Sequence, residues 1–268
     1  MSGSFGHRTK QRNQPQPETS NTAADLVNDI TIGVGSIRLN SRIIDITSPL
    51  TKRLDAVWAQ GSNQGGRFPG VALSDTTYHV FVMRNSLGEV DGGFDTSITA
   101  QNAPAGWVAK RVSSIMRLSS TIRGFIQNGV YFELKDLSLT DMNNVFVPVA
   151  STLYRVSVPT GIKAMYRGHV SPGRALANTS MALVIQSPDQ VPLVSAVSSF
   201  LGAFRGSLGV YDGTSYFTSE SCEVQVLTNI SGEVAMSRSG NYSTLSAIYG
   251  TTLQPLGWVD IGLIAGGF

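Results

Sequence analysis

Apolar and polar positions alternate along most of the chain after residue 29, in short runs separated by turn residues. The clearest run is TYHVFVMR at residues 77–84, in which every second side chain falls on the same face of an extended strand. The sequence NSLG at residues 85–88 then supplies a turn, with glycine available where a positive φ is needed. Residues 89–97 continue as a second run, so the pattern predicts a β-hairpin over residues 77–97.

Other short runs rich in β-branched residues predict strands in both halves of the chain. In the first half they lie at residues 30–37, 42–46, 111–118, 121–127 and 130–134. In the second half they lie at residues 146–158, 162–170, 181–186, 206–211, 221–227, 233–237 and 245–253. Residues 188–204 fit either one face of a helix or an extended edge. Turn residues separate the runs at the spacing typical of a sandwich or jelly roll, so the predicted fold class is all-β.

The sequence also predicts one short helix, packed on the first sheet. Ser48 suits its N-cap. Leu50, Leu54 and Trp58 then fall on one helical face. Gly61 ends the pattern.

Composition divides the chain into three parts. Residues 1–29 contain few large apolar side chains and cannot bury enough surface to offset their ordering entropy, so they are predicted to form an extended attachment arm. A polar stretch at residues 136–144 separates two β-rich blocks. The predicted domains are therefore the arm (1–29), a β-rich module with the short helix (30–135) and a jelly-roll-like β-sandwich (136–268).

Charge and composition restrict the classes of partner. The formal net charge is +2 and no basic stripe is present, so nucleic acid is not an expected partner. No window approaches the roughly 20 apolar residues of a membrane span, and the N-terminus lacks the apolar core of a signal peptide, so no membrane insertion and no export are expected. No lysine follows Lys163, and the resulting Ser/Thr-rich surface fits carbohydrate or protein contact.

Few residues offer metal or thiol chemistry. His7, His79 and His169 have no second histidine or close carboxylate at metal-ligand spacing, so no metal and no cofactor are predicted. Cys222 is the single cysteine, which excludes an intrachain disulfide. It is interpreted as a buried apolar residue in a strand, with an interchain disulfide or a reactive thiol as the alternative.

Hydrolytic chemistry has two candidate arrangements. A Ser-His-Asp group stays open because its members come from distant positions, although no serine has the Gly-x-Ser-x-Gly setting. Paired carboxylates of a glycan hydrolase could be Asp91 with Asp95, or Glu220 with Glu223. Residues four apart on a strand share a face, so the alternative is that Asp91 and Asp95 are simply solvated. The prediction is a protein without enzymatic activity.

Aromatic residues suggest a contact surface in the second half. Asp212 begins a strong Asp-Gly turn, and Tyr211 and Tyr216 flank it. Together with Tyr242 they are predicted to stack on a sugar of a host receptor, and the alternative is that the rings are core or cross-strand pairs. Trp258 is predicted to anchor the last strand.

The order of several segments resembles a module of bacteriophage virion appendage proteins, the tail-fibre and head-fibre-like family. The segments that carry the resemblance are DITI at 29–32, KRLDAVW at 52–58, YHV at 78–80, VD at 90–91 and KRVSSI at 110–115, with looser matches at 157–161 and 257–260. The chain departs from the family at Trp107, where tyrosine is usual, at Lys110, where a second arginine is usual, and in its apolar end at residues 261–268.

The resemblance implies a structural virion protein of a tailed phage, assembled in the host cytoplasm. The leading reading is a tail-fibre or receptor-binding subunit; a capsid decoration or head-fibre protein is the alternative, and a tail-spike glycan hydrolase is a third class. No catalytic residue is implied. The expected partners are further copies of the chain, with a trimer as the default, other virion proteins of the tail, neck or capsid, and a host cell-surface glycan or protein. Predicted virion-attachment residues are Phe5, His7, Arg8, Lys10 and Arg12, and predicted subunit contacts are Leu263, Ile264 and Phe268.

Overall fold

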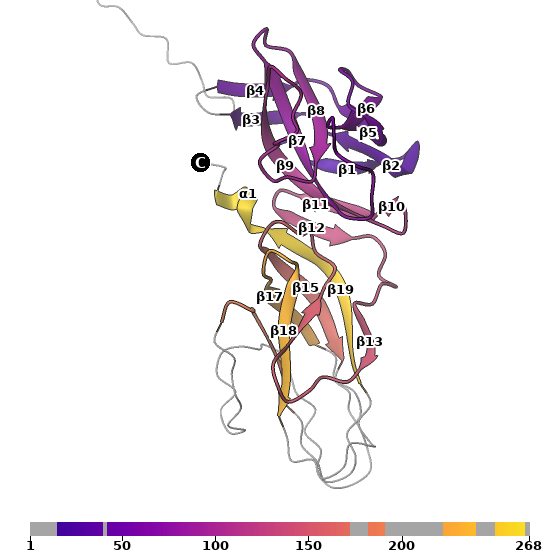
Figure 1. Ribbon diagram of the computed structural model, residues 1–268, viewed down its shortest axis with the longest axis vertical. Helices are drawn as coiled ribbons and strands as arrows, with labels where there is room; N and C mark the ends of the chain where they lie inside the picture. The colour runs from indigo at the N-terminus through magenta and orange to yellow at the C-terminus, as the bar shows by residue number, and fades with distance from the viewer. Residues whose placement is uncertain (1–14, 40–41, 172–181, 191–221, 240–249, 266–268) are drawn as a thin grey trace, which may run out of the picture.

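The computed structural model describes residues 15–39, 42–171, 182–190, 222–239 and 250–265 (Figure 1). These residues form an all-β fold, as the alternating pattern predicted, with one short helix, α1 (Ile261–Ala265), near the C-terminus.

Nineteen strands are described. Those of the first half are β1 (Thr19–Thr22), β2 (Asp25–Ile32), β3 (Gly35–Leu39), β4 (Arg42–Ile46), β5 (Leu50–Val57), β6 (Gln64–Arg67), β7 (Thr77–Asn85), β8 (Val90–Asp95), β9 (Trp107–Leu118), β10 (Thr121–Ile122), β11 (Phe125–Asn128) and β12 (Tyr131–Leu134). Those of the second half are β13 (Met142–Val145), β14 (Thr152–Arg155), β15 (Ala164–Ser171), β16 (Ala182–Gln186), β17 (Cys222–Leu227), β18 (Glu233–Ser239) and β19 (Thr251–Asp260).

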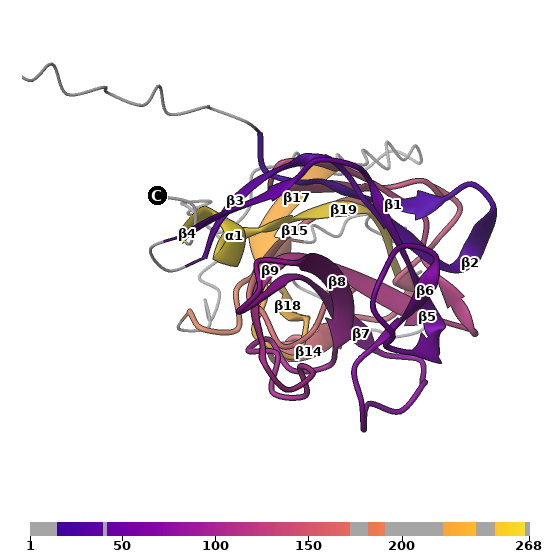
Figure 2. The same cartoon turned by 90° about the horizontal axis from the view of Figure 1, so that it is seen from above.

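A mixed sheet of 14 strands runs through both halves of the described chain, in the order β10-β9-β7-β8-β6-β5-β2-β1-β11-β12-β19-β15-β17, with β13 also paired to β19. β14-β18-β16 form a second sheet, and β3-β4 form a separate hairpin. The molecule is elongated, with β11, β12 and β19 between its two ends (Figure 1). Viewed down the long axis, the main sheet curls, with β1 and β19 on one side and β7 and β8 on the other (Figure 2).

The predicted hairpin is the β7–β8 pair, in which His79 lies opposite Asp95 and Arg84 opposite Val90. β9 pairs with the other edge of β7, so β7 is an internal strand of the sheet. Residues 77–83 are all buried, so both faces of β7 are covered. In a strand at the surface, successive side chains would point alternately to the core and to solvent. In β7 the side chains of both faces lie inside the protein.

The predicted helix before Gly61 is wrong. Leu50–Val57 is strand β5, which pairs antiparallel with β2 and parallel with β6. The alternation of apolar and polar residues along β5 is hard to see in the sequence, because one of its two buried side chains, Lys52, is charged and only the other, Leu54, is apolar. Pairing on both edges outweighs the helical spacing of the apolar residues.

The predicted N-terminal arm extends too far. Residues 19–29 lie in β1 and β2, and β1 also pairs with β11, so this part of the arm belongs to the sheet. Thr19 and Asn21 are buried there. Thr19 bonds to Gln127 through its backbone N and its hydroxyl, and Asn21 Oδ1 accepts a hydrogen bond from the backbone N of Phe125. Residues 1–14 lie outside the described residues.

An aromatic cluster joins the two halves. Trp258 of β19 is buried and stacks on Phe132 of β12, with ring centroids 4.8 Å apart and ring planes 4° from parallel. Phe125 of β11 packs against both rings. The prediction that Trp258 anchors the last strand is confirmed. The boundary predicted between residues 135 and 136 lies between β12 and β13, and the main sheet crosses it through the β12–β19 pair.

Candidate functional site

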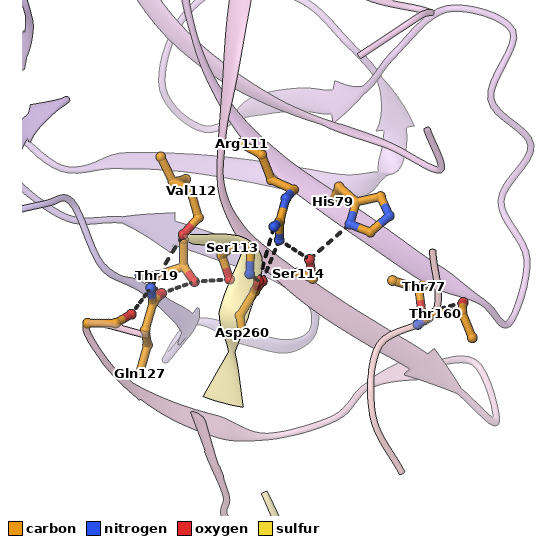
Figure 3. Close-up of polar contacts among 12 residues, drawn as sticks. Thr19, Thr77, His79, Arg111, Val112, Ser113, Ser114, Gln127, Thr160 and Asp260 are labelled. Carbon is orange, nitrogen blue, oxygen red and sulfur yellow. Dashed lines mark hydrogen bonds and ion pairs between the residues drawn. The ribbon is translucent and has the colours of Figure 1, made fainter. Parts of the chain in front are cut away.

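A buried network of polar side chains lies where β1, β7, β9 and β11 meet the end of β19; we call it the polar junction (Figure 3). Its central contact joins Arg111 of β9 to Asp260 of β19, which are 149 residues apart in the sequence. Arg111 Nη2 donates a hydrogen bond to Asp260 Oδ1 at 3.0 Å, and Nη1 pairs with Oδ2. The Asp260 side chain is fully buried, so this charge-assisted pair is shielded from water.

Ser114 connects the ion pair to His79. Its hydroxyl oxygen accepts a hydrogen bond from Arg111 Nη1 at 2.9 Å and lies 2.9 Å from His79 Nδ1 (Figure 3). Burial, and then the positive charge of Arg111, lower the pKa of His79 to about 4. The imidazole is therefore neutral at neutral pH.

The loop before β15 covers the outer side of this histidine. Thr160 donates to Thr77 Oγ1 through its backbone N at 2.8 Å, and the two hydroxyl oxygens are 3.0 Å apart. Gly161 follows with φ of +82°, and a Cβ at that position would lie 3.1 Å from His79 Nε2. A glycine is needed here both for the backbone conformation and for the close approach to the ring.

A second branch of the polar junction holds the first strand. Thr19 Oγ1 lies 2.8 Å from Ser113 Oγ and 2.7 Å from Gln127 Oε1, which also accepts from the Thr19 backbone N (Figure 3). Gln127 Nε2 donates to the carbonyl oxygens of Val112 and Gly129. β1, β9 and β11 are thus tied together by groups that are satisfied inside the protein.

The polar junction is not a catalytic triad. Asp260 binds Arg111, and none of its hydrogen bonds goes to His79. Ser114, His79 and Asp260 are each at most 1% exposed, so a substrate has no path to the hydroxyl. The chemical effect of this arrangement is to fix strands from distant parts of the chain in one register.

The candidate carboxylate pair on β8 is also internal. Asp91 and Asp95 are both fully buried, so the reading of solvated side chains is wrong. Asp91 lies 3.2 Å from Lys52 Nζ and accepts a hydrogen bond from Gly61 N at 3.0 Å. Asp95 accepts hydrogen bonds from the backbone N of Ser97 and from Asn102. Both faces of β8 are covered, so neither carboxylate lies in solvent. Through these hydrogen bonds each carboxylate holds a loop in place.

Lys52 has a full set of partners. Its ammonium group donates to the carbonyl oxygens of Ala59 and Gly61 at 2.8 and 2.9 Å, and to Asp91 at 3.3 Å. Burial lowers the pKa of Lys52, and the Asp91 carboxylate opposes this shift. The pair closes the loop between β5 and β6 onto β8.

One of the predicted subunit contacts is contradicted. Leu263 is 7% exposed and packs into the core of its own chain, so it is not available to a neighbouring subunit. Ile264 on the same helix is 47% exposed. Phe268 lies outside the described residues.

Most of the other predicted site residues also lie outside the described residues. These are Phe5, His7, Arg8, Lys10, Arg12, Tyr211, Asp212, Tyr216, Glu220 and Tyr242, and the same holds for most of the ambiguous segment at residues 188–204. Glu223 is described: it is exposed on β17 and accepts a hydrogen bond from Arg167 of β15 at 3.3 Å.

Sequence reasoning missed two features. The first is the Arg111–Asp260 pair, although both residues lie in segments that carry the phage resemblance. The second is a surface pocket of about 310 Å³ beside the β3–β4 hairpin, lined in part by Arg42 and Arg84. The two arginines come from separate strands, so their proximity has no signal in local spacing.

Comparison with known proteins gave no match: no protein-family model, no curated protein and no solved structure is significantly similar to this chain. Within the described ranges, no group of three or more histidine, cysteine or acidic side chains is arranged to hold a metal ion. The same residues contain no helix with the length and apolar character of a membrane span. Function is therefore inferred from the residues and their arrangement.

Proposed function

We propose that this chain is a structural virion protein of a tailed bacteriophage, and that it serves as a subunit of a tail fibre or receptor-binding appendage. The observation that carries the proposal is the convergence at the polar junction. Three of the segments that resemble phage appendage proteins supply its residues, 78–80, 110–115 and 257–260, and a fourth, 157–161, covers His79 through Gly161. Because the side chains of these segments bond to one another in the interior, they fix how the strands are arranged. Residues with that role are the ones we expect a shared structural module to have in common.

The positions and hydrogen-bond partners of the ionisable side chains support a structural role. Lys52, Asp91, Asp95, Arg111 and Asp260 all have internal hydrogen-bond partners. The hydrolase alternative also loses its first pair of candidate acids, since Asp91 and Asp95 are buried. A simple check is the release of reducing ends from host surface polysaccharide, which we expect to be absent with purified protein.

The arm and the apolar end fit assembly into a larger particle. On this proposal residues 1–14 attach the subunit to the virion, and Ile264 and Phe268 contribute to contacts between copies, with a trimer as the expected state. Light scattering of the purified chain would give the mass of the assembly in multiples of 28.6 kDa.

The presence of the chain in particles is the first test. Particles of a phage whose genome encodes this chain would be purified from a lysate on a density gradient and analysed by peptide mass spectrometry. We expect the chain to copurify with the major capsid protein in a fixed ratio. Loss of the chain during banding, with capsid retained, would contradict a virion role.

A further inference from the structure

A pocket that we call the hairpin pocket lies between the β3–β4 hairpin, the end of β7 and the start of β9, and two positively charged side chains line it. Its volume of about 310 Å³ is at the lower end of the range for small-molecule sites. Arg42 of β4 and Arg84 of β7 both line it. Among the described residues neither guanidinium group has an ion-pair or hydrogen-bond partner.

Two unpaired guanidinium groups on one pocket favour an anion. Like charges around a shared space repel each other, and a bound anion replaces that repulsion with charge-assisted hydrogen bonds. Glu89, the acidic residue of the neighbouring turn, accepts a hydrogen bond from the Asn85 side chain and forms no ion pair with either arginine among the described residues. Arginine also presents paired donors that match the two oxygens of a carboxylate.

The remaining lining is apolar with a hydroxyl at the edge. Leu39 and Ile44 contribute aliphatic side chains from the hairpin, and Val108 contributes one from β9. Ser86 is exposed in the β7–β8 turn and can donate or accept a hydrogen bond. An aliphatic wall, a hydroxyl and two cations together suit a ring with an apolar face, hydroxyl groups and one carboxylate.

We propose that the hairpin pocket binds a carboxylated sugar residue, such as the uronic acid units of bacterial surface polysaccharides. The carboxylate would lie between Arg42 and Arg84, and a C–H face of the sugar would pack on Leu39 and Val108. The polysaccharide as the source of the ligand rests on the proposed function; the anion site rests on the pocket alone.

The test is saturation-transfer NMR of the full-length protein with methyl β-D-glucuronide, and with methyl β-D-glucoside as the neutral analogue. We expect saturation transfer to the glucuronide only. Arg42→Gln and Arg84→Gln should each weaken binding about tenfold or more, which is a loss of about 1.4 kcal/mol, because each removes charge-assisted hydrogen bonds to the carboxylate. Arg38→Gln is the matched control: Arg38 is exposed on the same hairpin, outside the pocket, and its loss should change nothing.

Three results would overturn the proposal. They are equal saturation of the glucoside, unchanged glucuronide binding in both glutamine variants, and displacement of the glucuronide by an equal concentration of inorganic phosphate, which would indicate a general anion site. Arg42 is exposed, so Arg42→Gln should fold normally, and its thermal unfolding would be checked against the wild type. The assay needs no virion, so it can fail or succeed independently of the particle assignment.

Discussion

At the scale of single residues, burial determines what each ionisable side chain does in this protein. Lys52 is fully buried, yet three acceptors surround its ammonium group. Removing one member of such a pair leaves the other charge buried without a partner, which costs more than the pair itself contributes.

Lys52→Met should therefore destabilise the fold strongly. We expect the free energy of unfolding in urea to fall by about 3–5 kcal/mol, because Asp91 then keeps a buried charge without its cation. The matched control is Arg53→Met. It removes the neighbouring cation, which forms an exposed surface pair with Asp55, and it should change stability by less than about 1 kcal/mol. Equal effects of the two substitutions would contradict the structural role of Lys52.

His79 should make stability depend on pH. Its pKa is about 4 in the folded protein and about 6.5 in the unfolded chain, so the unfolded state takes up the proton first as the pH falls. The stabilisation is complete above pH 6.5 and is lost progressively down to pH 4, by about 3 kcal/mol at most. Arg111 strengthens this shift, and Asp260 and Asp95 oppose it.

The measurement compares urea unfolding between pH 7 and pH 4 in the wild type and in His79→Gln. The variant should lack most of the fall attributable to His79, whereas His169→Gln, at a half-buried position, should retain it. Asp141 acts in the opposite direction, because burial raises the pKa of its carboxyl, but it is common to all three proteins and cancels in the comparison. Parallel pH profiles for wild type and His79→Gln would show that the buried imidazole does not titrate as described.

At the scale of elements, the Arg111–Asp260 pair fastens β19 and α1 to β9. Asp260→Asn keeps the shape of the side chain and removes the charge, so Arg111 stays buried without an anion. We expect faster amide hydrogen exchange in residues 257–265 and 110–115, together with a loss of roughly 3 kcal/mol in stability. Glu223→Gln, on an exposed pair with Arg167, is the control. Unchanged exchange in residues 257–265 would mean that the pair does not hold the last strand.

The same scale shows which elements sequence patterns can predict. The β7–β8 hairpin follows from local alternation and a turn. β5 does not, because its inward positions include Lys52, and a lysine reads as a solvent-facing residue until its partners are known. The polar junction could not be predicted either: Arg111 and Asp260 meet only after β9 and β19 are placed in one sheet, and local spacing carries no information on that pairing.

At the scale of the whole molecule, one sheet links the two halves of the chain. β1 pairs with β11, β12 pairs with β19, and Trp258 stacks on Phe132 across the middle. Cutting the chain between residues 135 and 136 would leave β12 and β19 without their shared edge and would expose the aromatic cluster to water.

We therefore expect fragments 1–135 and 136–268 to lack cooperative unfolding on their own, while the full chain unfolds in one transition seen alike by tryptophan fluorescence and far-UV circular dichroism. Mixing the two fragments is the control for the effect of cutting the chain. If the fragments associate and restore the sheet, the cooperative transition should return. A sigmoidal unfolding curve for either isolated fragment would show that the halves are independent domains.

Immunogold electron microscopy of purified particles tests the proposed role most directly. The antibody would be raised against the full chain, because the sheet crosses residue 135 and a fragment would present non-native surfaces. We predict label confined to the tail of the particle. Label spread over the capsid would contradict the tail assignment in favour of a decoration or head-fibre protein, and particles without label would contradict the virion role itself.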